Sequence, residues 1–435
     1  MKRTLRRVGL AAAGLLALGL AARPAAAAPP VVVTLWSWTP VTPTMNAMVA
    51  AIEKAHPGIE VRATIQPHTA DFTAMKAAAA SGTLPDIIGL PPGAYTQEYR
   101  PHLQDLTATA EGAWGKDWQT HFAPALLTEA RLGNPKGDPS FYMLPEEAQV
   151  INIWYNRDVF KKVGIAGPPH SFDQMIADAA KLRAKGYIPF YQGGATGLFD
   201  GWMFMQIAAQ TDLHDLLAAQ QGAPVWDKPG MIAAARAWQR LFTAHVVQPG
   251  ALAALQYPTG ANLFAAGRVG MISLGSWWLQ ETGLSSNPPL KTMSGYGIFF
   301  FPALTAQGQA SPPLGGIDIG WGLTKTAARS PAVEAAAKIV LKELISGVGE
   351  QVALNQLNDL PAFAGMKPQQ TLSPHLQNLY DTYMRQLATA HTHAVGNPVV
   401  FQALVSGLQA IGAGSETPEA AMAAVQKTAL AQQGK

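Results

Sequence analysis

The stretch that decides the fold is 142–190, YMLPEEAQVINIWYNRDVFKKVGIAGPPHSFDQMIADAAKLRAKGYIPF. An extended apolar run ends in WYNRD, and a short basic turn then leads to Pro168-Pro169. Ser171 is placed to cap a helix, because Gln174 three residues later completes a capping box. Gly186 is placed to end that helix. The order predicts a buried strand, a turn and an amphipathic helix.

The same alternation begins near the N-terminus. The β-branched run 31–36 predicts a strand buried on both faces. Apolar residues with helical spacing follow at 45–52, and 59–65 predicts a second strand. A helix at 71–80 and a strand start at 85–88 complete the pattern. Strands that alternate with helices predict a parallel α/β sheet with right-handed crossovers.

The order of these motifs resembles family 1 extracellular solute-binding proteins, the receptors of ABC importers that include the maltose-binding protein. Those proteins carry a similar "LYYNKDLFKKAG…PP.TWDE" signature where the chain first crosses between two lobes. Further likeness lies in 264–274, in the glycine-rich run 315–322 and in 358–362 (NDLPA). The resemblance covers most of 31–365 in order.

The resemblance implies a two-lobed periplasmic binding protein fold. Each α/β lobe would hold a mainly parallel sheet flanked by helices, and three hinge crossings would join the lobes near 146–149, 314–319 and 358–361. Lobe one would comprise 30–146 plus 318–359, and lobe two 147–316 plus 361–435. Ligands in such sheets bind outside the carboxyl ends of the strands, which places the expected site in the cleft between the lobes.

The first 28 residues are expected to be a cleaved export signal. Four basic residues (Lys2, Arg3, Arg6 and Arg7) precede an apolar run too short to span a bilayer, and small residues at 25–28 offer cleavage sites. Paired arginines leave both the Sec and the twin-arginine route open. Removing the five basic residues of 1–28, which contains no acid, changes the formal charge from +3 to −2.

The remaining composition excludes several classes of protein. No basic run marks the mature part, so nucleic acid and anionic membrane are not expected partners. The chain has no cysteine, which excludes disulfides, cysteine-ligated metals and a lipidated cysteine anchor. We expect a soluble, monomeric periplasmic protein that is not lipid-anchored and uses no cofactor.

Tryptophans follow several of the predicted strands. An aromatic face stacks on the apolar C–H face of a sugar ring and loses little side-chain entropy on binding. Core packing is an equally reasonable interpretation for each of them, and Trp277 is the first choice as a ligand contact. The candidates are Trp36, Trp38, Trp202, Trp277, Trp278 and Trp321.

Carboxylates and amides form the second group of candidates, because sugar hydroxyls need both donors and acceptors. In an extended strand, adjacent Glu146 and Glu147 point apart, so only one of them is expected to face the cleft. Each acid has a structural role as its alternative. The candidates are Asp86, Glu146, Glu147, Gln149, Asp200 and Asp318.

Catalytic interpretations have less support. Paired carboxylates also occur in glycoside hydrolases, but the order of elements resembles binding proteins rather than a (β/α)₈ barrel. His391 and His393 lack a third ligand at recognisable spacing, so we expect a solvated loop there rather than a metal site. No common protease, esterase or nucleotide-binding motif is present.

The sequence therefore predicts a solute-binding protein with no enzymatic activity. It would capture a sugar or oligosaccharide in the cleft and deliver it to ABC permease subunits in the inner membrane. Two alternatives remain open: a periplasmic ligand sensor or scaffold of the same fold, and a binding protein for a polyol or a glycerol phosphodiester. The ligand itself is not specified.

Overall fold

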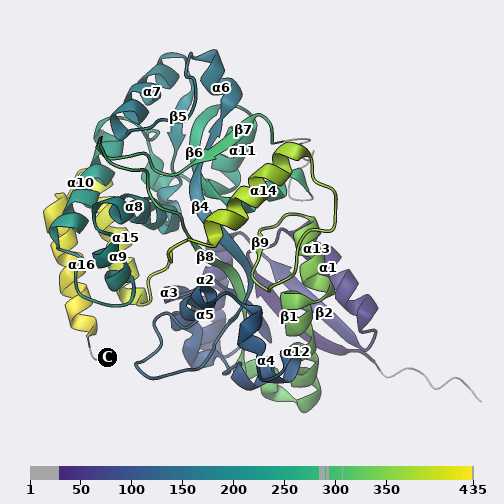
Figure 1. Cartoon of the computed structure of the whole chain (residues 1–435). Helices are drawn as coiled ribbons and strands as arrows, with labels where there is room; N and C mark the ends of the chain where they lie inside the picture. Colours follow the sequence, from purple (N-terminus) through teal and green to yellow (C-terminus); the bar gives the residue numbers. More distant parts are fainter. Residues whose placement is uncertain (1–28, 284–289, 291–292, 306, 434–435) are drawn as a thin grey trace, which may run out of the picture.

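The computed structural model describes residues 29–283, 290, 293–305 and 307–433. The predicted export signal lies outside the described residues. Two α/β lobes lie one above the other in Figure 1 and share one sheet, with strand order β2-β1-β3-β8-β4-β6-β5 and with β7 and β9 paired to β4. Within the described ranges, no helix is both long and apolar enough to cross a bilayer.

Lobe one is a four-stranded layer with helices on its faces. β1 pairs in parallel with both β2 and β3, and β3 pairs antiparallel with β8. The expected strand at 31–36 is present, but its burial on both faces is wrong, because buried and partly exposed residues alternate along it. The elements are β1 (Val31–Ser37), α1 (Thr42–Ala55), β2 (Ile59–Ile65), α2 (His68–Ser81), β3 (Ile87–Leu90), α3 (Ala94–Tyr99), η1 (Arg100–His102), α4 (Thr107–Trp114), η2 (Trp118–His121), α5 (Pro124–Ala130), η7 (Lys325–Arg329), α12 (Pro331–Ser346) and α13 (Val348–Asn355).

Two long strands carry the chain between the lobes. β4 (Leu144–Asn156) is buried along its whole length and pairs antiparallel with β8 (Leu314–Leu323). Its first residues, such as Ala148, pack in the core of lobe one, and later ones, such as Ile153, pack in the core of lobe two. The short β9 (Leu360–Pro361) pairs with β4 at the same level. We keep the lobe boundaries given above as a proposal.

Lobe two has a mixed sheet. Only β5 and β6 pair in parallel, whereas β4 is antiparallel to both β6 and β7, so a mainly parallel sheet describes lobe one alone. The helices α15 and α16 complete this lobe by packing on α8 and α10. The elements are α6 (Arg157–Lys162), α7 (Phe172–Ala184), β5 (Ile188–Tyr191), η3 (Gly194–Thr196), α8 (Leu198–Thr211), α9 (Leu213–Gln220), α10 (Pro229–Thr243), η4 (Ala251–Ala253), η5 (Gln256–Gly260), α11 (Ala261–Ala265), β6 (Val269–Gly275), η6 (Ser276–Thr282), β7 (Tyr296–Phe299), α15 (Pro398–Ala413) and α16 (Pro418–Gln432).

The helix starts follow local chemistry. Ser171 Oγ accepts a hydrogen bond from Gln174 N at 3.2 Å, as the capping box predicts, and Gln174 Oε1 accepts one from His170 N at 3.0 Å. Asn156 caps α6 by accepting from Val159 N at 2.9 Å. These side chains occupy backbone donors that a helix start leaves unpaired.

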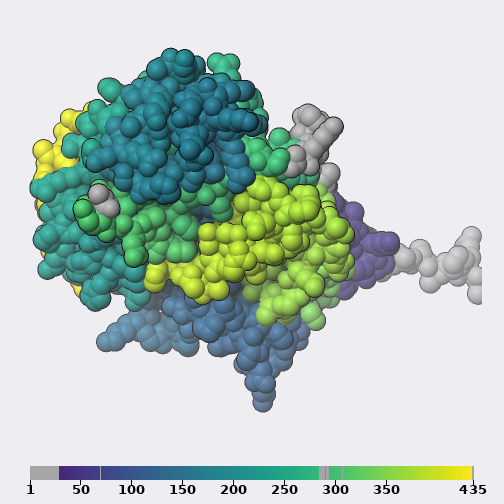
Figure 2. Space-filling view, turned by 45° about the horizontal axis from the view of Figure 1, so that its top comes forward, coloured from purple at the N-terminus to yellow at the C-terminus, as the bar shows by residue number. Residues whose placement is uncertain are grey.

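The C-terminal part contains α14 (Pro374–Leu387) and a bridging segment after it. Figure 2 shows the yellow-green chain on the surface between the two lobes. Residues 391–397, here called the strap, bond to both lobes: Val395 O accepts from Ala94 N of lobe one at 2.7 Å, and Gly396 N donates to Gln220 O of lobe two at 2.9 Å. The strap therefore fixes one side of the junction.

Candidate functional site

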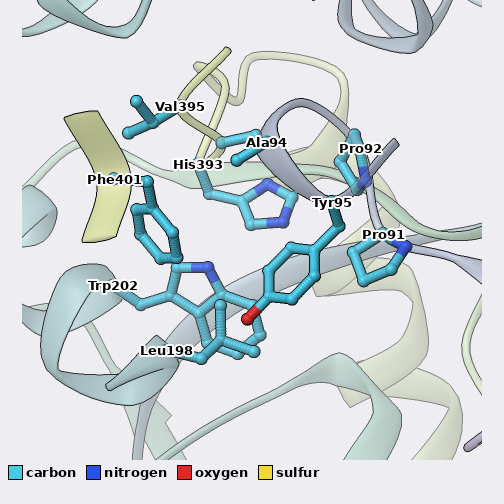
Figure 3. A pocket seen from close by; sticks show the side chains of 10 residues that line it. Pro91, Pro92, Ala94, Tyr95, Leu198, Trp202, His393, Val395 and Phe401 are labelled. Atoms are coloured by element: carbon cyan, nitrogen blue, oxygen red, sulfur yellow. The ribbon is translucent and has the colours of Figure 1, made fainter. Parts of the chain in front are cut away.

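A cavity lies between the lobes where α3, α8 and the strap meet (Figure 3). Its volume is about 20 Å³, which is room for about one water molecule. A larger solute therefore requires the lobes to part. The lining residues come from lobe one (Pro91, Pro92, Ala94, Tyr95), from lobe two (Leu198, Trp202, Phe401) and from the strap (His393, Ala394, Val395).

Lobe two supplies a pair of tryptophans to this region. The Trp202 ring, in the second turn of α8, lies 5.7 Å from the Trp277 ring and 5.5 Å from the His393 ring. Trp277 Nε1 donates a hydrogen bond to the hydroxyl of Tyr257 at 2.8 Å. A side chain at Gly275 would run into the Trp277 ring, so the glycine that ends β6 allows the indole to fold back. Two of the predicted residues, Trp202 and Trp277, are thus brought together.

Lobe one supplies the facing aromatic surface. Trp38 follows β1 and lies 5.5 Å, ring to ring, from Phe72, which is 4.8 Å from Tyr95. Tyr95 in turn lies 6.2 Å from Phe401 of lobe two. Figure 3 shows the Tyr95 and Trp202 side chains extending toward each other across the cavity. Rings from both lobes therefore form one aromatic lining.

Buried polar side chains lie next to this aromatic lining. Gln149 on β4 lies with its Nε2 2.8 Å from His393 Nε2, while His393 Nδ1 is 3.4 Å from Glu129 Oε1. Asp200 in the first turn of α8 accepts a hydrogen bond from Gln192 at 2.9 Å. Burial raises the pKa of Asp200 to about 7, and the hydrogen bond from Gln192 opposes that shift.

Several of these buried atoms have no hydrogen-bond partner within the described ranges. They are Gln149 Oε1, Gln192 Oε1, His393 Nδ1 and Asp200 Oδ2. An unsatisfied buried polar atom costs about 1–3 kcal/mol. Water or a polar solute that enters the parted cleft would satisfy such groups.

Neither of the two glutamates of the first crossing lines the cavity. Glu147 accepts hydrogen bonds from Asn358 Nδ2 at 2.5 Å and from Asp359 N at 3.1 Å. Glu146 is fully buried and lies near Trp321 and Glu350. The two side chains have different partners, but neither lines the cavity, so the expectation that one of them faces the cleft is not met.

Four further candidates lie outside the cleft lining. Asp86 precedes β3 at its amino end, where it accepts from Thr34 N at 2.8 Å and pairs with Arg329. The sequence interpretation had placed Asp86 near the loops at the carboxyl ends of the strands, and that placement is wrong. Trp278 is fully buried, with its ring 4.9 Å from that of Trp154. Trp321 is fully buried in the core of lobe one, and Trp36 packs partly exposed against that core.

The sequence interpretation missed part of the site. His393 was expected in a solvated loop, but it is 3 % exposed and lines the cavity. Tyr95, Tyr257 and Phe401 were not singled out, because they lie on helices or loops far apart in the sequence. Their association depends on the junction of the lobes, which leaves no local pattern.

One group of potential metal ligands exists among the described residues. Asp212, His214 and Asp215 bring ligand atoms within 4.8 Å of one another. Asp212 already serves as the cap of α9, with its Oδ1 accepting from Asp215 N at 2.9 Å. None of the three residues lines the cavity, and the position of Asp212 is explained by helix capping.

Comparisons with known proteins agree with this architecture. A provisionally named binding protein of Brucella abortus (strain 2308) is 27% identical over 209 residues, 46% of this chain and 46% of that protein. The "Multiple sugar-binding protein" of Streptococcus mutans serotype c (strain ATCC 700610 / UA159) is 26% identical over 157 residues, 35% of this chain and 34% of that protein. The chain thus spans less than half the length of the curated relatives it matches.

Similarity of structure extends over nearly the whole chain. A chitin oligosaccharide binding protein superposes with a TM-score of 0.75 at 23% identity, covering 92% of this chain and 98% of that one. The family described as "Bacterial extracellular solute-binding protein" matches residues 36–343. The predicted two-lobed α/β fold and the predicted resemblance to solute-binding proteins are confirmed. The chain belongs to the bacterial extracellular solute-binding protein family.

Proposed function

We propose that this protein captures a mono- or oligosaccharide between its lobes and delivers it to an ABC permease in the membrane. The observation that carries the proposal is the aromatic lining contributed by both lobes, backed by unsatisfied buried polar atoms. This combination fits a ring with one apolar face and many hydroxyl groups. The names of a sugar-binding relative and a chitin oligosaccharide-binding structural neighbour support the same class.

Binding would proceed by a population shift between open and closed forms. A sugar that contacts Trp277 from one lobe and Tyr95 from the other makes both contacts only when the lobes are closed. That differential affinity would drive closure. The permease would then recognise the closed form. We expect the protein to act as a monomer after export from the cytoplasm.

The charge of the lining helps to choose between sugars and phosphodiesters as candidate ligands. Neither Lys nor Arg is among the described residues that line the cavity. A phosphate-bearing solute needs such a group or a helix N-terminus. Two helices, α3 and α8, do begin in the lining, at Ala94 and Leu198, so a phosphodiester would meet helix starts but no cationic side chain. The lining therefore favours sugars and polyols over glycerol phosphodiesters.

A thermal-shift screen across neutral sugars, amino sugars, polyols and glycerol phosphodiesters tests the proposal. A solute present at 100 times its Kd stabilises the folded protein by about 2.7 kcal/mol. At least one saccharide is expected to raise the melting temperature in this way. Stabilisation by a phosphodiester alone would contradict the proposal.

A further inference from the structure

A buried carboxylate, that of Glu129 on α5, links lobe one to a crossing strand and to the strap. Its Oε2 accepts a hydrogen bond from Ile317 N of β8 at 2.5 Å, and its Oε1 accepts one from the Thr392 hydroxyl of the strap at 2.5 Å. A side chain at Gly316 would run into this carboxylate. The predicted site residue Asp318, next to Ile317, is partly exposed and is not among the lining residues. The position of Glu129 is therefore fixed by backbone and side-chain bonds from two other segments.

The Thr392 hydroxyl passes this constraint on to His393. It donates to Glu129 and accepts a hydrogen bond from Ala394 N at 3.2 Å, so it holds the strap on both sides of His393. His393 is 3 % exposed and lines the cavity, with its ring 5.5 Å from that of Trp202 (Figure 3). Glu129 thus positions a polar side chain of the lining.

The two ring nitrogens of His393 have different neighbours. Gln149 Nε2 lies 2.8 Å from His393 Nε2, and because an amide nitrogen can only donate, the ring nitrogen accepts. The proton of the neutral imidazole then lies on Nδ1. Glu129 Oε1 lies 3.4 Å from Nδ1, and a carboxylate beside Nδ1 favours a proton there. Both neighbours therefore select the tautomer with an acceptor at Nε2.

A second acceptor lies beside the first. Gln149 Oε1 has no hydrogen-bond partner among the described residues, although Gln149 is only 2 % exposed. It belongs to the amide group that contacts His393 Nε2. A neutral solute that reaches these two acceptors must bring a donor, because a buried acceptor without a partner is costly. A sugar hydroxyl is such a donor.

We propose that His393 is the polar contact of the solute, accepting a hydrogen bond from one sugar hydroxyl at Nε2, and that Glu129 is its positioning residue. The inference rests on the proposed saccharide function of the same cleft. A hydroxyl that enters between Gln149 and His393 when the lobes part donates to the ring and accepts from the amide. A site built around such a hydroxyl rejects an analogue that lacks it. His393 therefore determines specificity at one position of the sugar.

Titration calorimetry with fluorinated sugars tests the contact. Maltose, cellobiose, lactose and N,N′-diacetylchitobiose are compared first, and the disaccharide that binds most tightly is then compared with its monodeoxyfluoro derivatives. Fluorine takes the place of a hydroxyl but cannot donate. We expect one derivative to bind at least tenfold more weakly than the unmodified disaccharide. His393→Phe should bring this ratio close to one, whereas His170→Phe, the control at an exposed histidine, should keep it.

Nitrogen NMR of histidine-labelled protein at pH 8 tests the role of Glu129. The spectrum shows which ring nitrogen carries the proton, and His393→Phe identifies the signals of His393. We expect the proton on Nδ1 in the parent protein. Glu129→Gln should move it partly to Nε2 and lower the fluorine ratio at least threefold, whereas Glu111→Gln, at an exposed acid of α4, should change neither. Thr392→Val, which leaves the carboxylate in place, should lower the ratio as well.

Three results would overturn the inference in different ways. A proton on Nε2 in the parent protein, or a fluorine ratio that survives in His393→Phe, removes the contact while the saccharide function stands. A ratio that is unchanged in both Glu129→Gln and Thr392→Val removes the positioning role. If no disaccharide binds and no saccharide stabilises the protein in the thermal-shift screen, the inference falls together with the saccharide function.

Discussion

Two adjacent tryptophans show how neighbouring residues acquire different roles. Trp277 is 8 % exposed and lies against Trp202 of the cleft, whereas Trp278 is fully buried among Trp154, Phe264 and Tyr296. The sequence WW placed both as candidates, with Trp277 first. Both belong to the same buried cluster, and only the three-dimensional packing places Trp277 against a residue of the cavity lining.

We therefore expect opposite results from the two alanine variants. Trp277→Ala should weaken sugar binding by about 2 kcal/mol or more, the usual threshold of a binding hot spot. Trp278→Ala should lower the free energy of unfolding of the sugar-free protein by about 3–5 kcal/mol, the usual cost of truncating a large core residue. Calorimetry of binding and denaturant unfolding on both variants measure the two quantities. A large loss of stability in Trp277→Ala with unchanged affinity would remove Trp277 from the site.

Asp200 gives a pH-dependent prediction. Its pKa is raised by burial from 3.8 to about 7, so between these values the folded protein holds a proton that the unfolded chain has lost. The stability that Asp200 contributes is full below about pH 4 and is lost as the pH rises toward 7. The stability difference between Asp200→Asn and the parent should therefore shift in favour of the variant as the pH rises from 5 to 8, by about 3 kcal/mol at most.

Urea unfolding of Asp200→Asn and of the parent protein at both pH values checks this prediction. Asp227→Asn serves as the control, because Asp227 is an exposed acid and should show no such shift. An equal difference between Asp200→Asn and its parent at pH 5 and pH 8 would show that Asp200 is ionised throughout this range.

At the scale of elements, local sequence signals predicted the positions of helices and strands well. Sequence signals did not predict which distant strands and loops lie together. The capping box at Ser171 and the apolar spacing of Met45, Met48 and Ile52 placed α7 and α1 correctly. The mixed pairing in lobe two and the burial of His393 were missed, because they depend on which distant strands and loops meet. The same reason explains why Asp86, next to a correctly predicted strand, was placed at the wrong end of it.

The strap gives a prediction at this scale. Gly133 has φ +87°, and a side chain there would run into the backbone oxygen of Gly396 in the strap. The added methyl of Gly133→Ala should push the strap away from lobe one and so favour the open form. Sugar affinity should then fall several-fold. Gly137→Ala is the matched control, since Gly137 has φ +86° with nothing within 4 Å of its added methyl. Equal affinities in both variants, measured by calorimetry, would show that the strap does not contribute to closure.

For the whole molecule, the order of motifs predicted the fold and the class of protein. It did not identify the solute. The order of motifs across 31–365 was enough to indicate two lobes and a binding protein. The cavity is lined by side chains from α3, α8, α15 and the strap, whose meeting point no single segment encodes. The small cavity adds a requirement for motion, since about 20 Å³ cannot hold a sugar ring.

Small-angle scattering of the protein with and without a saturating sugar tests the central claim most directly. We predict that the free protein samples an open form and that the sugar reduces its radius of gyration toward the value calculated for the closed lobes. Calorimetry on the same sample establishes saturation. A radius of gyration that stays unchanged while the site is fully occupied would contradict capture by closure between the lobes.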